Sequence, residues 1–367
     1  MSNTNKKYLF YLVVFFLIGF GCKSASQSTN SAKEKAHNMY VLSSRFFHPR
    51  NSNDIHSTVD AIEQLKPKRI DWIYYESDEI LSIYKKYNLP FSLAINPQIR
   101  DSSGYTSKKL RMKDFEGATY VAPWMKNWKV TNPYWGCVNN PDFYDLFVKR
   151  TLFLASKGAY GIFVDDALFN VRLTIEKKVG CFCNHCVALF NTRNEENTAV
   201  NSDIVHKIIK YKEITKKVKD KELIALIKKY EAFQFNSVVL FFNNWKKIIK
   251  EQYPDIVFLT NNYNGNWNEI YRVFDMGIAE VKEKFINDTA LDSLYTVADH
   301  LQKKQLFTIA TENKELQYKL LDYNKQHNKE SIYPWDIFIP AKNERFYIDL
   351  DTITQKIKEI KKITYKS

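Results

Sequence analysis

Short apolar runs rich in β-branched and aromatic residues alternate with longer segments of helical periodicity along most of the chain. Apolar runs bounded by turn residues are typical of buried strands, whereas apolar residues recurring every three or four positions indicate amphipathic helices. The predicted strands are 40–47, 69–75, 90–96, 160–166, 256–262, 276–281, 306–312 and 336–339. The predicted helices are 58–65, 78–87, 142–156, 203–219, 221–250, 291–304 and 352–363.

This alternation predicts an α/β fold, a (β/α)8 TIM barrel over residues 38–367 with a long helical insertion after the fourth strand. The alternative is an open doubly wound sheet, whose first turn between strand and helix would be rich in glycine. Here that turn reads Phe47-His48-Pro49-Arg50. The chain has no G-x-G-x-x-G and no G-x-x-x-x-G-K-[ST], so no nucleotide and no organic cofactor is expected.

The N-terminus has the pattern of a secretory signal. Lys6 and Lys7 precede an uncharged apolar stretch, 8–21, that ends at Cys22. We expect a lipoprotein signal peptide over 1–21, lipidation of Cys22 and a flexible Ser-, Asn- and Lys-rich tether over 22–37. An ordinary cleaved signal or an uncleaved anchor is the alternative. The protein is expected to be exported and lipid-anchored to the bacterial cell envelope, on the periplasmic or surface face of the outer membrane.

The chain is basic, with 54 Lys+Arg against 41 Asp+Glu and a formal charge of +13. Removal of residues 1–21 takes away Lys6 and Lys7 and lowers this charge to +11. Basic proteins can bind nucleic acids, membranes or anionic polymers. Export makes nucleic acid an unexpected partner, and membrane contact is expected through the lipid anchor alone. The lysines concentrate in 207–250, where their spacing fits the solvated faces of amphipathic helices.

Four cysteines remain besides Cys22. Cys181, Cys183 and Cys186 lie within six residues, and Cys137 precedes them. Four thiolates suit a closed tetrahedral zinc site, whose role would be structural because no coordination position stays open. Two disulfides are an alternative in an exported protein, although C-x-C and C-x-x-C pairs close small, strained loops. Free thiols are the third possibility.

This cysteine spacing resembles the zinc cluster of family 42 glycoside hydrolases. A lone Cys137 is followed 44 residues later by Cys-x-Cys-x-x-Cys and then by Leu189-Phe190. The resemblance covers 135–190 and extends to a wider set of bacterial glycosyl-hydrolase-like barrel lipoproteins, whose last barrel strand is similar to Trp335-Asp336. It implies zinc on the four cysteines beside the substrate end of a barrel. Family 42 enzymes carry Asn-Glu after the fourth strand, where this chain has Asp165-Asp166, which argues against β-galactosidase activity.

Carboxylates follow several of the predicted strands. Active sites of barrels lie at the carboxyl ends of the strands, and hydrolysis of a glycosidic bond needs two carboxyl groups about 5 Å or about 6.5–9.5 Å apart. We expect Asp166 or Asp165 to act with Glu280 or Glu312. Each carboxylate could instead cap a helix or pair with a basic residue in a loop.

Aromatic and amide side chains near the predicted strand ends suit sugar recognition. The candidate substrate-binding residues are Arg45, His48, Tyr75, Asn96, Trp135, Asn261, Asn262, Trp335 and Asp336. The sequence therefore predicts a glycoside hydrolase acting on an oligo- or polysaccharide, and the positive charge favours an acidic one. The alternatives are a barrel that binds glycans without cleaving them, and an envelope scaffold whose basic helices contact a partner or an anionic polymer.

Overall fold

The computed structural model describes residues 40–43, 59, 62–100, 107–127, 132–193, 221–309 and 313–334. The predicted signal peptide, the tether and the helices 203–219 and 352–363 lie outside these residues. So do six of the predicted site residues, namely Cys22, Arg45, His48, Glu312, Trp335 and Asp336. Within the described part of the chain, no helix is long and apolar enough to cross a membrane.

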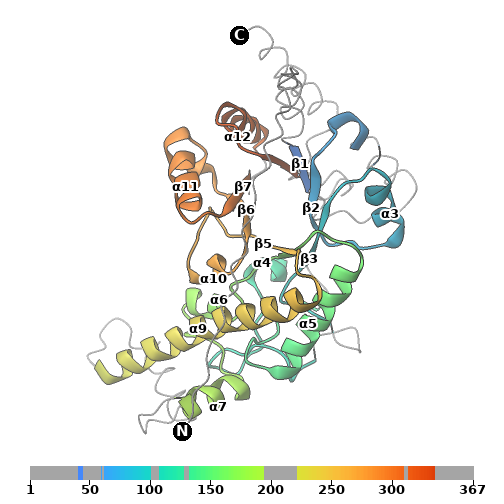
Figure 1. The fold of residues 1–367 in the computed structure, drawn as a ribbon. Coiled ribbons are helices and arrows are strands. Elements are labelled where there is room, and N and C mark those ends of the chain that lie inside the picture. The colour runs from blue at the N-terminus through green and yellow to red at the C-terminus, as the bar shows by residue number, and fades with distance from the viewer. Residues whose placement is uncertain are drawn as a thin grey trace, which may run out of the picture. The chain divides into compact units, whose positions relative to one another are not determined.

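The centre of the molecule is a parallel sheet whose strand order follows the chain, as Figure 1 shows. Its order is β7-β6-β5-β4-β3-β2-β1-β8, and each neighbouring pair is parallel. The strands are β1 (Tyr40–Ser43), β2 (Arg69–Ile73), β3 (Phe91–Ile95), β4 (Gly161–Val164), β5 (Val257–Thr260), β6 (Met276–Val281), β7 (Lys304–Ile309) and β8 (Ser331–Pro334).

The two end strands of this order, β7 and β8, come close to each other, with Cα atoms within 8 Å. No backbone ladder joins them in the ranges that the structure describes. The structure thus shows an α/β fold with a parallel sheet in barrel order, and it does not establish the complete eight-stranded barrel that the sequence predicts.

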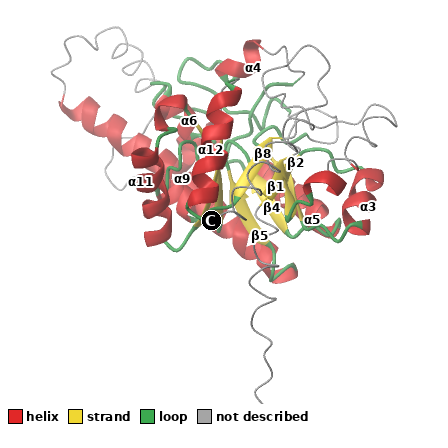
Figure 2. Cartoon of the chain, turned by 90° about the horizontal axis from the view of Figure 1, so that it is seen from above, coloured by secondary structure: helices red, strands yellow, loops and turns green. Residues whose placement is uncertain are grey.

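Helices surround the strands, as seen in Figure 2. They are α3 (Asp78–Lys86), α4 (Pro123–Asn127), α5 (Pro141–Ser156), α6 (Val171–Ile175), α7 (Asn184–Arg193), α9 (Lys221–Gln252), α10 (Glu269–Arg272), α11 (Asp288–His300) and α12 (Lys314–Gln326), with a 3-10 turn, η1 (Glu283–Phe285). Polar side chains begin many of them: Ser77 and Asn140, for example, accept hydrogen bonds from first-turn amides of α3 and α5. The long α9 belongs to the connection from β4 to β5 and packs on α5, α6 and α10.

Two elements differ from the prediction. The sequence reading places no helix between the seventh and eighth strands, yet α12 fills that position. It also places the eighth strand at 336–339, whereas β8 ends at Pro334. Leu316, Leu320 and Leu321 recur at helical spacing, so α12 could have been predicted from the sequence. The strand that follows this helix is β8, which begins at Ser331.

Successive residues of a strand point to opposite faces, and here the two faces have different cores. One set, on the face away from the helices, includes Trp72, Phe163, Leu259 and Ile278, with the rings of Trp72 and Phe163 stacked at 4.3 Å between centroids. The other face packs on helices, through residues such as Leu93, Val164 and Phe258 against aromatic side chains of α5 and α9. This alternation determines which residues beyond the strand ends can share a site.

Candidate functional site

The inner-face alternation continues past the carboxyl ends of the strands and brings polar residues together. Counting in steps of two from Trp72, Phe163, Leu259 and Ile278 leads to Tyr74, Asp165, Asn261 and Glu280. These four side chains are joined by hydrogen bonds, although they come from β2, β4, β5 and β6. The period of two along a strand therefore assembles the site.

Asn261 lies between two carboxyl groups. Its Nδ2 donates to Asp165 Oδ1 at 3.3 Å and to Glu280 Oε2 at 3.1 Å. The two carboxyl oxygens are therefore at most about 6.4 Å apart. An amide nitrogen carries two hydrogens that diverge, so the two bonds can form together and hold the carboxyl groups at that separation.

Asp165 lies where an ionised carboxylate is unfavourable. Burial, followed by the charges of Asp166 and Glu280, raises its pKa to about 7, against the lowering effect of hydrogen bonds from Tyr74 and Asn261. Tyr74 donates its hydroxyl to Asp165 Oδ2 at 2.6 Å, and burial raises the pKa of this phenol well above its usual value. A carboxyl group of this kind can carry a proton near neutral pH and release it to a substrate.

Asp166 lies in a different environment from its neighbour. It occupies the turn after β4 with a φ of 54°, in the left-handed region. Its Oδ1 accepts hydrogen bonds from the Tyr263 hydroxyl and, at 3.3 Å, from Arg172 Nη2. Burial raises the pKa of Asp166, while Arg172 and Tyr263 oppose the rise. Asp166 is thus ion-paired, and its backbone N–H donates to Asp165 Oδ1 at 3.0 Å.

Arg172 is held by rings on two sides. Its guanidinium carbon lies 5.1 Å from the ring centre of Trp124 and 4.7 Å from that of Tyr263. Such cation–π contacts orient a guanidinium and favour its charged form. Arg172 and Tyr263 were not among the residues predicted from the sequence. The available signals were their nearness to Asp166 and Asn261 in the chain, six and two residues away.

The structure does not bring the other described candidates into this group. Trp135 is fully buried, and its indole N–H lies 3.4 Å from Met125 Sδ. Asn262 is also buried, and its amide pairs with that of Gln305. Both side chains are therefore part of the protein interior. Asn262 points away from Asn261 because successive residues of a strand alternate between faces. Tyr75 is partly exposed and packs on the main hydrophobic core. Asn96 Oδ1 accepts a hydrogen bond from the backbone N–H of Gln98 at 2.9 Å.

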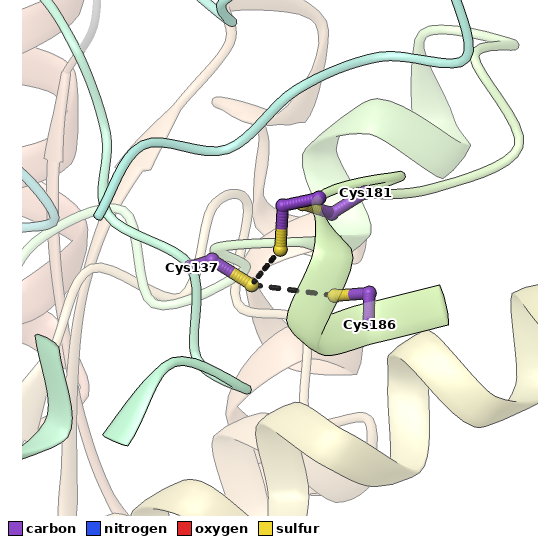
Figure 3. Close-up of side chains that lie close together, drawn as sticks. Cys137, Cys181 and Cys186 are labelled. Carbon is purple, nitrogen blue, oxygen red and sulfur yellow. Dashed lines mark hydrogen bonds between the residues drawn. The ribbon is translucent and has the colours of Figure 1, made fainter. Parts of the chain in front are cut away.

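The four cysteines form a second cluster, with Cys137 on the loop before α5, Cys181 and Cys183 on the loop before α7, and Cys186 in the first turn of α7. Their Sγ atoms all lie within 4.8 Å of one another, the residues are buried, and none is in a disulfide. Figure 3 shows Cys137 facing Cys186, with the two sulfur atoms 3.3 Å apart. A tetrahedral Zn–S bond of about 2.3 Å implies sulfur atoms about 3.8 Å apart. The four cysteines therefore fit a single metal ion of that size.

The four thiols differ in how their surroundings shift their pKa. Burial raises the pKa of Cys181 and Cys186, whereas hydrogen bonds from the other cysteines lower the pKa of Cys183. Cysteine binds a divalent ion as the thiolate, so metal binding to this cluster would release protons. The aromatic core around the cluster, with Phe182, Phe190 and Tyr230, joins α7 to α9.

Two β-galactosidases of known structure have a fold similar to that of this chain. The β-galactosidase of the psychrophilic Marinomonas ef1 matches with a TM-score of 0.55 at 9% identity, over 89% of this chain and 60% of that one. The β-galactosidase of Rahnella sp. R3 matches with a TM-score of 0.52 at 12% identity, over 79% of this chain and 49% of that one. This chain thus spans about half to three fifths of those enzymes.

A third similar structure is the glycoside hydrolase domain of PelA from Pseudomonas aeruginosa, with a TM-score of 0.42 at 8% identity, over 81% of this chain and 95% of that one. No family model matches the chain, and no curated protein matches its sequence. At these identities the likeness to the two β-galactosidases shows the fold alone, so the function has to be argued from the site.

Proposed function

We propose that the protein is a glycoside hydrolase in which Asp165 and Glu280 are the catalytic pair. The observation that carries this proposal is the bridge through Asn261, which holds two carboxyl groups at most about 6.4 Å apart on the inner face of the sheet. The glycoside hydrolase fold supports it, as do the titration properties of Asp165. We further propose that β7 and β8 close the sheet into a (β/α)8 barrel.

The separation favours the retaining mechanism, in which the carboxyl groups lie about 5–5.5 Å apart. Asp165, protonated near neutral pH, donates its proton to the leaving glycosidic oxygen. The Glu280 carboxylate attacks the anomeric carbon, so the bond to the leaving group breaks and a glycosyl ester forms. Asp165, now ionised, takes a proton from water, the water oxygen displaces Glu280, and both carboxyl groups return to their starting states.

The pairing of Asp166 with Arg172 gives it a separate role. Hydrogen bonds from Arg172 and Tyr263 already occupy Asp166 Oδ1, so this oxygen is less free than those of Asp165 to transfer a proton or to attack a sugar. Asp166 instead positions Asp165 through its backbone N–H and places Arg172 beside the carboxyl pair. Arg172 and the partly exposed Trp124 then offer a positive group and a flat ring to a sugar, a combination that suits an acidic glycan.

The remaining sequence expectations complete the proposal. The metal on the four cysteines would be zinc, held in a closed structural site without an organic cofactor. Lipidation of Cys22 would anchor the protein to the cell envelope after export. The substrate would then be an oligo- or polysaccharide outside the cytoplasm. No nucleic acid is expected as a partner.

The test is reducing-end release by the full chain from a panel of neutral and acidic oligosaccharides. The variants are Asp165→Asn and Glu280→Gln, with Glu283→Gln as the control because that carboxylate is exposed on the neighbouring η1 turn. We expect the two site variants to lower kcat by about 10²–10⁴-fold and the control to keep it. On an aryl glycoside with a good leaving group, Asp165→Asn should regain formation of the glycosyl ester, since that leaving group needs no proton.

Three outcomes would contradict the proposal. Turnover that survives both site variants would remove Asp165 and Glu280 from catalysis. Glycan binding without turnover on every substrate, detected as a rise in Tm, would favour the alternative of a non-catalytic glycan-binding barrel. No response to any glycan would favour the envelope scaffold.

A further inference from the structure

One buried side chain connects the cysteine cluster to the segment that carries Asp166. Asn170 is fully buried, and its Nδ2 donates to Cys137 Sγ at 3.3 Å and to Cys186 Sγ at 3.5 Å. The same nitrogen lies 3.0 Å from Gln234 Oε1, and Asn170 Oδ1 accepts from the backbone N–H of Val138 at 3.2 Å.

This set of bonds is unusual for the position that Asn170 occupies. Asn170 is the N-cap residue of α6, where an asparagine side chain ordinarily accepts from the first amides of its own helix. Here the side chain makes no cap bond. Its amide group is instead directed to the cysteine loops, which leaves the turn before α6 dependent on those loops for its position.

The turn itself needs support from outside. Between Asp166 and Arg172 the chain is closed by short-range bonds, from Phe169 N to Asp166 O at 3.2 Å and from Arg172 N to Phe169 O at 2.9 Å. Asp166 and Phe169 both have φ in the left-handed region, at 54° and 43°. Non-glycine residues in that region are strained and persist only where the surroundings hold them.

We propose that Asn170 is a positioning residue through which the metal-loaded cysteine cluster holds the turn 166–172. This turn directly follows Asp165 and is called the catalytic turn. The path runs from Cys137 and Cys186 to the Asn170 amide and along the turn to the Asp166 N–H, which donates to Asp165 Oδ1. Partners that bind metal ligands commonly fix the ligands and the surrounding backbone together.

The cluster offers a matched control in Asn139. Its Nδ2 donates to Cys186 Sγ at 3.2 Å, so it also places an amide hydrogen on a cluster sulfur. It is partly exposed, however, and lies before α5 rather than on the turn after β4. Loss of an amide donor can therefore be compared at two places, of which only one leads to the catalytic turn.

The test measures hydrogen exchange of the full, reduced chain with Zn²⁺ and with a chelator. In the wild type, we expect Zn²⁺ to slow exchange in both 165–173 and 181–190 by at least about tenfold. Asn170→Ala should keep the slowing in 181–190 and lose it in 165–173, whereas Asn139→Ala should keep both. Asn170→Asp, which keeps the acceptor for Val138 and loses the donor, serves if the alanine variant does not fold.

Two results would overturn this inference. One is a wild type in which Zn²⁺ protects 181–190 and leaves 165–173 unchanged, and the other is an Asn170→Ala chain in which both segments respond as in the wild type. Sulfur-to-metal absorption of the Co²⁺-substituted chain verifies that each variant still binds metal.

The effect on catalysis rests on the proposed function, whereas the exchange experiment does not. If the chain is a glycosidase, Asn170→Ala should lower kcat more than it raises KM and shift the pH profile that reports Asp165, because the turn donates to that carboxyl group. Absence of turnover in the wild type would count against the proposed function and leave the exchange result to decide the coupling.

Discussion

Asp165 and Asp166 are neighbours in the chain, but their surroundings give them opposite roles. Asp165 is bonded to the uncharged groups of Tyr74 and Asn261, whereas Asp166 is bonded to the cation of Arg172. The sequence predicted that one of the two would act in catalysis, and the strand period of two allows only one of them to face the sheet interior. It could not predict which one would be ion-paired, because Arg172 reaches Asp166 only through the turn that the folded loop adopts.

At this scale, Asp165→Asn should change how stability depends on pH. The carboxyl pKa rises from 3.8 to about 7 on folding, so the folded state binds more protons and the wild type loses stability as pH rises from about 4 to about 7. The variant removes this loss and should be the more stable chain at pH 8, with little difference at pH 4. Urea unfolding across this pH range measures it.

Asp145→Asn is the control for that series, since Asp145 is exposed on α5. Parallel stability curves for the wild type and Asp165→Asn over the whole pH range would contradict the raised pKa of Asp165. They would also weaken its assignment as the proton donor.

At the scale of elements, most of the sheet and its order could be predicted, because buried parallel strands are short apolar runs between helical segments. The strand ends were predicted too long, as at β4, where the expected range reaches Asp166 and the strand stops at Val164. Chain direction there is set by the turn through Asp166 and Phe169, whose left-handed conformations carry no signal in a hydrophobic pattern. Helix α12 was missed although its apolar spacing was present.

The start of α5 gives a prediction for this scale. Asn140 accepts from the backbone N–H groups of Asp142 and Phe143, and its Nδ2 donates to Lys109 O at 2.9 Å. Asn140→Ala removes the cap and leaves buried groups without partners, which should lower the free energy of unfolding by about 1–2 kcal/mol. Chemical denaturation gives this value.

Asn140→Asp separates the two contributions, because it keeps the cap acceptor and loses the donor to Lys109. We expect it to fall between the wild type and the alanine variant. Equal stability of Asn140→Ala and the wild type would show that α5 is positioned by its packing on β3, β4 and α9 alone.

At the scale of the whole molecule, the cysteine cluster should stabilise the hydrophobic core that surrounds it and have less effect on the other hydrophobic cores. The core around Cys181 and Cys186 brings together segments near 112–137, 173–190 and 227–233, which are far apart in sequence. Addition of a chelator to the reduced chain, after loading with Zn²⁺, should therefore lower Tm and expose Tyr230 and Phe182. A scan of thermal unfolding with and without chelator measures the shift.

The matched comparison is Cys186→Ser, which should show the lowered Tm in both conditions and no further response to chelator. An unchanged Tm of the wild type on chelation would mean that the cluster holds no metal that matters for folding.

A network of ion pairs lies at the opposite end of the sheet and should contribute to the stability of the whole fold. Buried Arg69 binds Asp71 at 2.7 Å and Glu330 at 2.6 Å, and Lys304 binds Glu330 at 2.7 Å. These bases lower the pKa of Glu330 to about 2. The stability that Glu330 contributes is present above its ordinary pKa near 4.5 and is lost as pH falls toward 2.

Glu330→Gln should thus destabilise the protein by roughly 3–5 kcal/mol at pH 7, with a difference from the wild type that shrinks below pH 4. Guanidinium is unsuitable as denaturant because its salt screens the pairs, so urea is used. Glu315→Gln, an exposed change on α12, is the control. A difference that does not vary with pH would exclude this ion network as the cause.

The same ion network has a mechanical consequence for the edge between β7 and β8. Lys304 is the first residue of β7, and Glu330 directly precedes β8. Side-chain charges therefore connect the two strands at one end of a boundary that no described backbone ladder closes. The contacts of the exposed Lys68 and Lys304 with Glu330 weaken with added salt, whereas the buried pair of Arg69 with Glu330 is screened much less. At high ionic strength we therefore expect β7 and β8 to separate before any other pair of neighbouring strands, because ion pairs connect them where no described backbone ladder does.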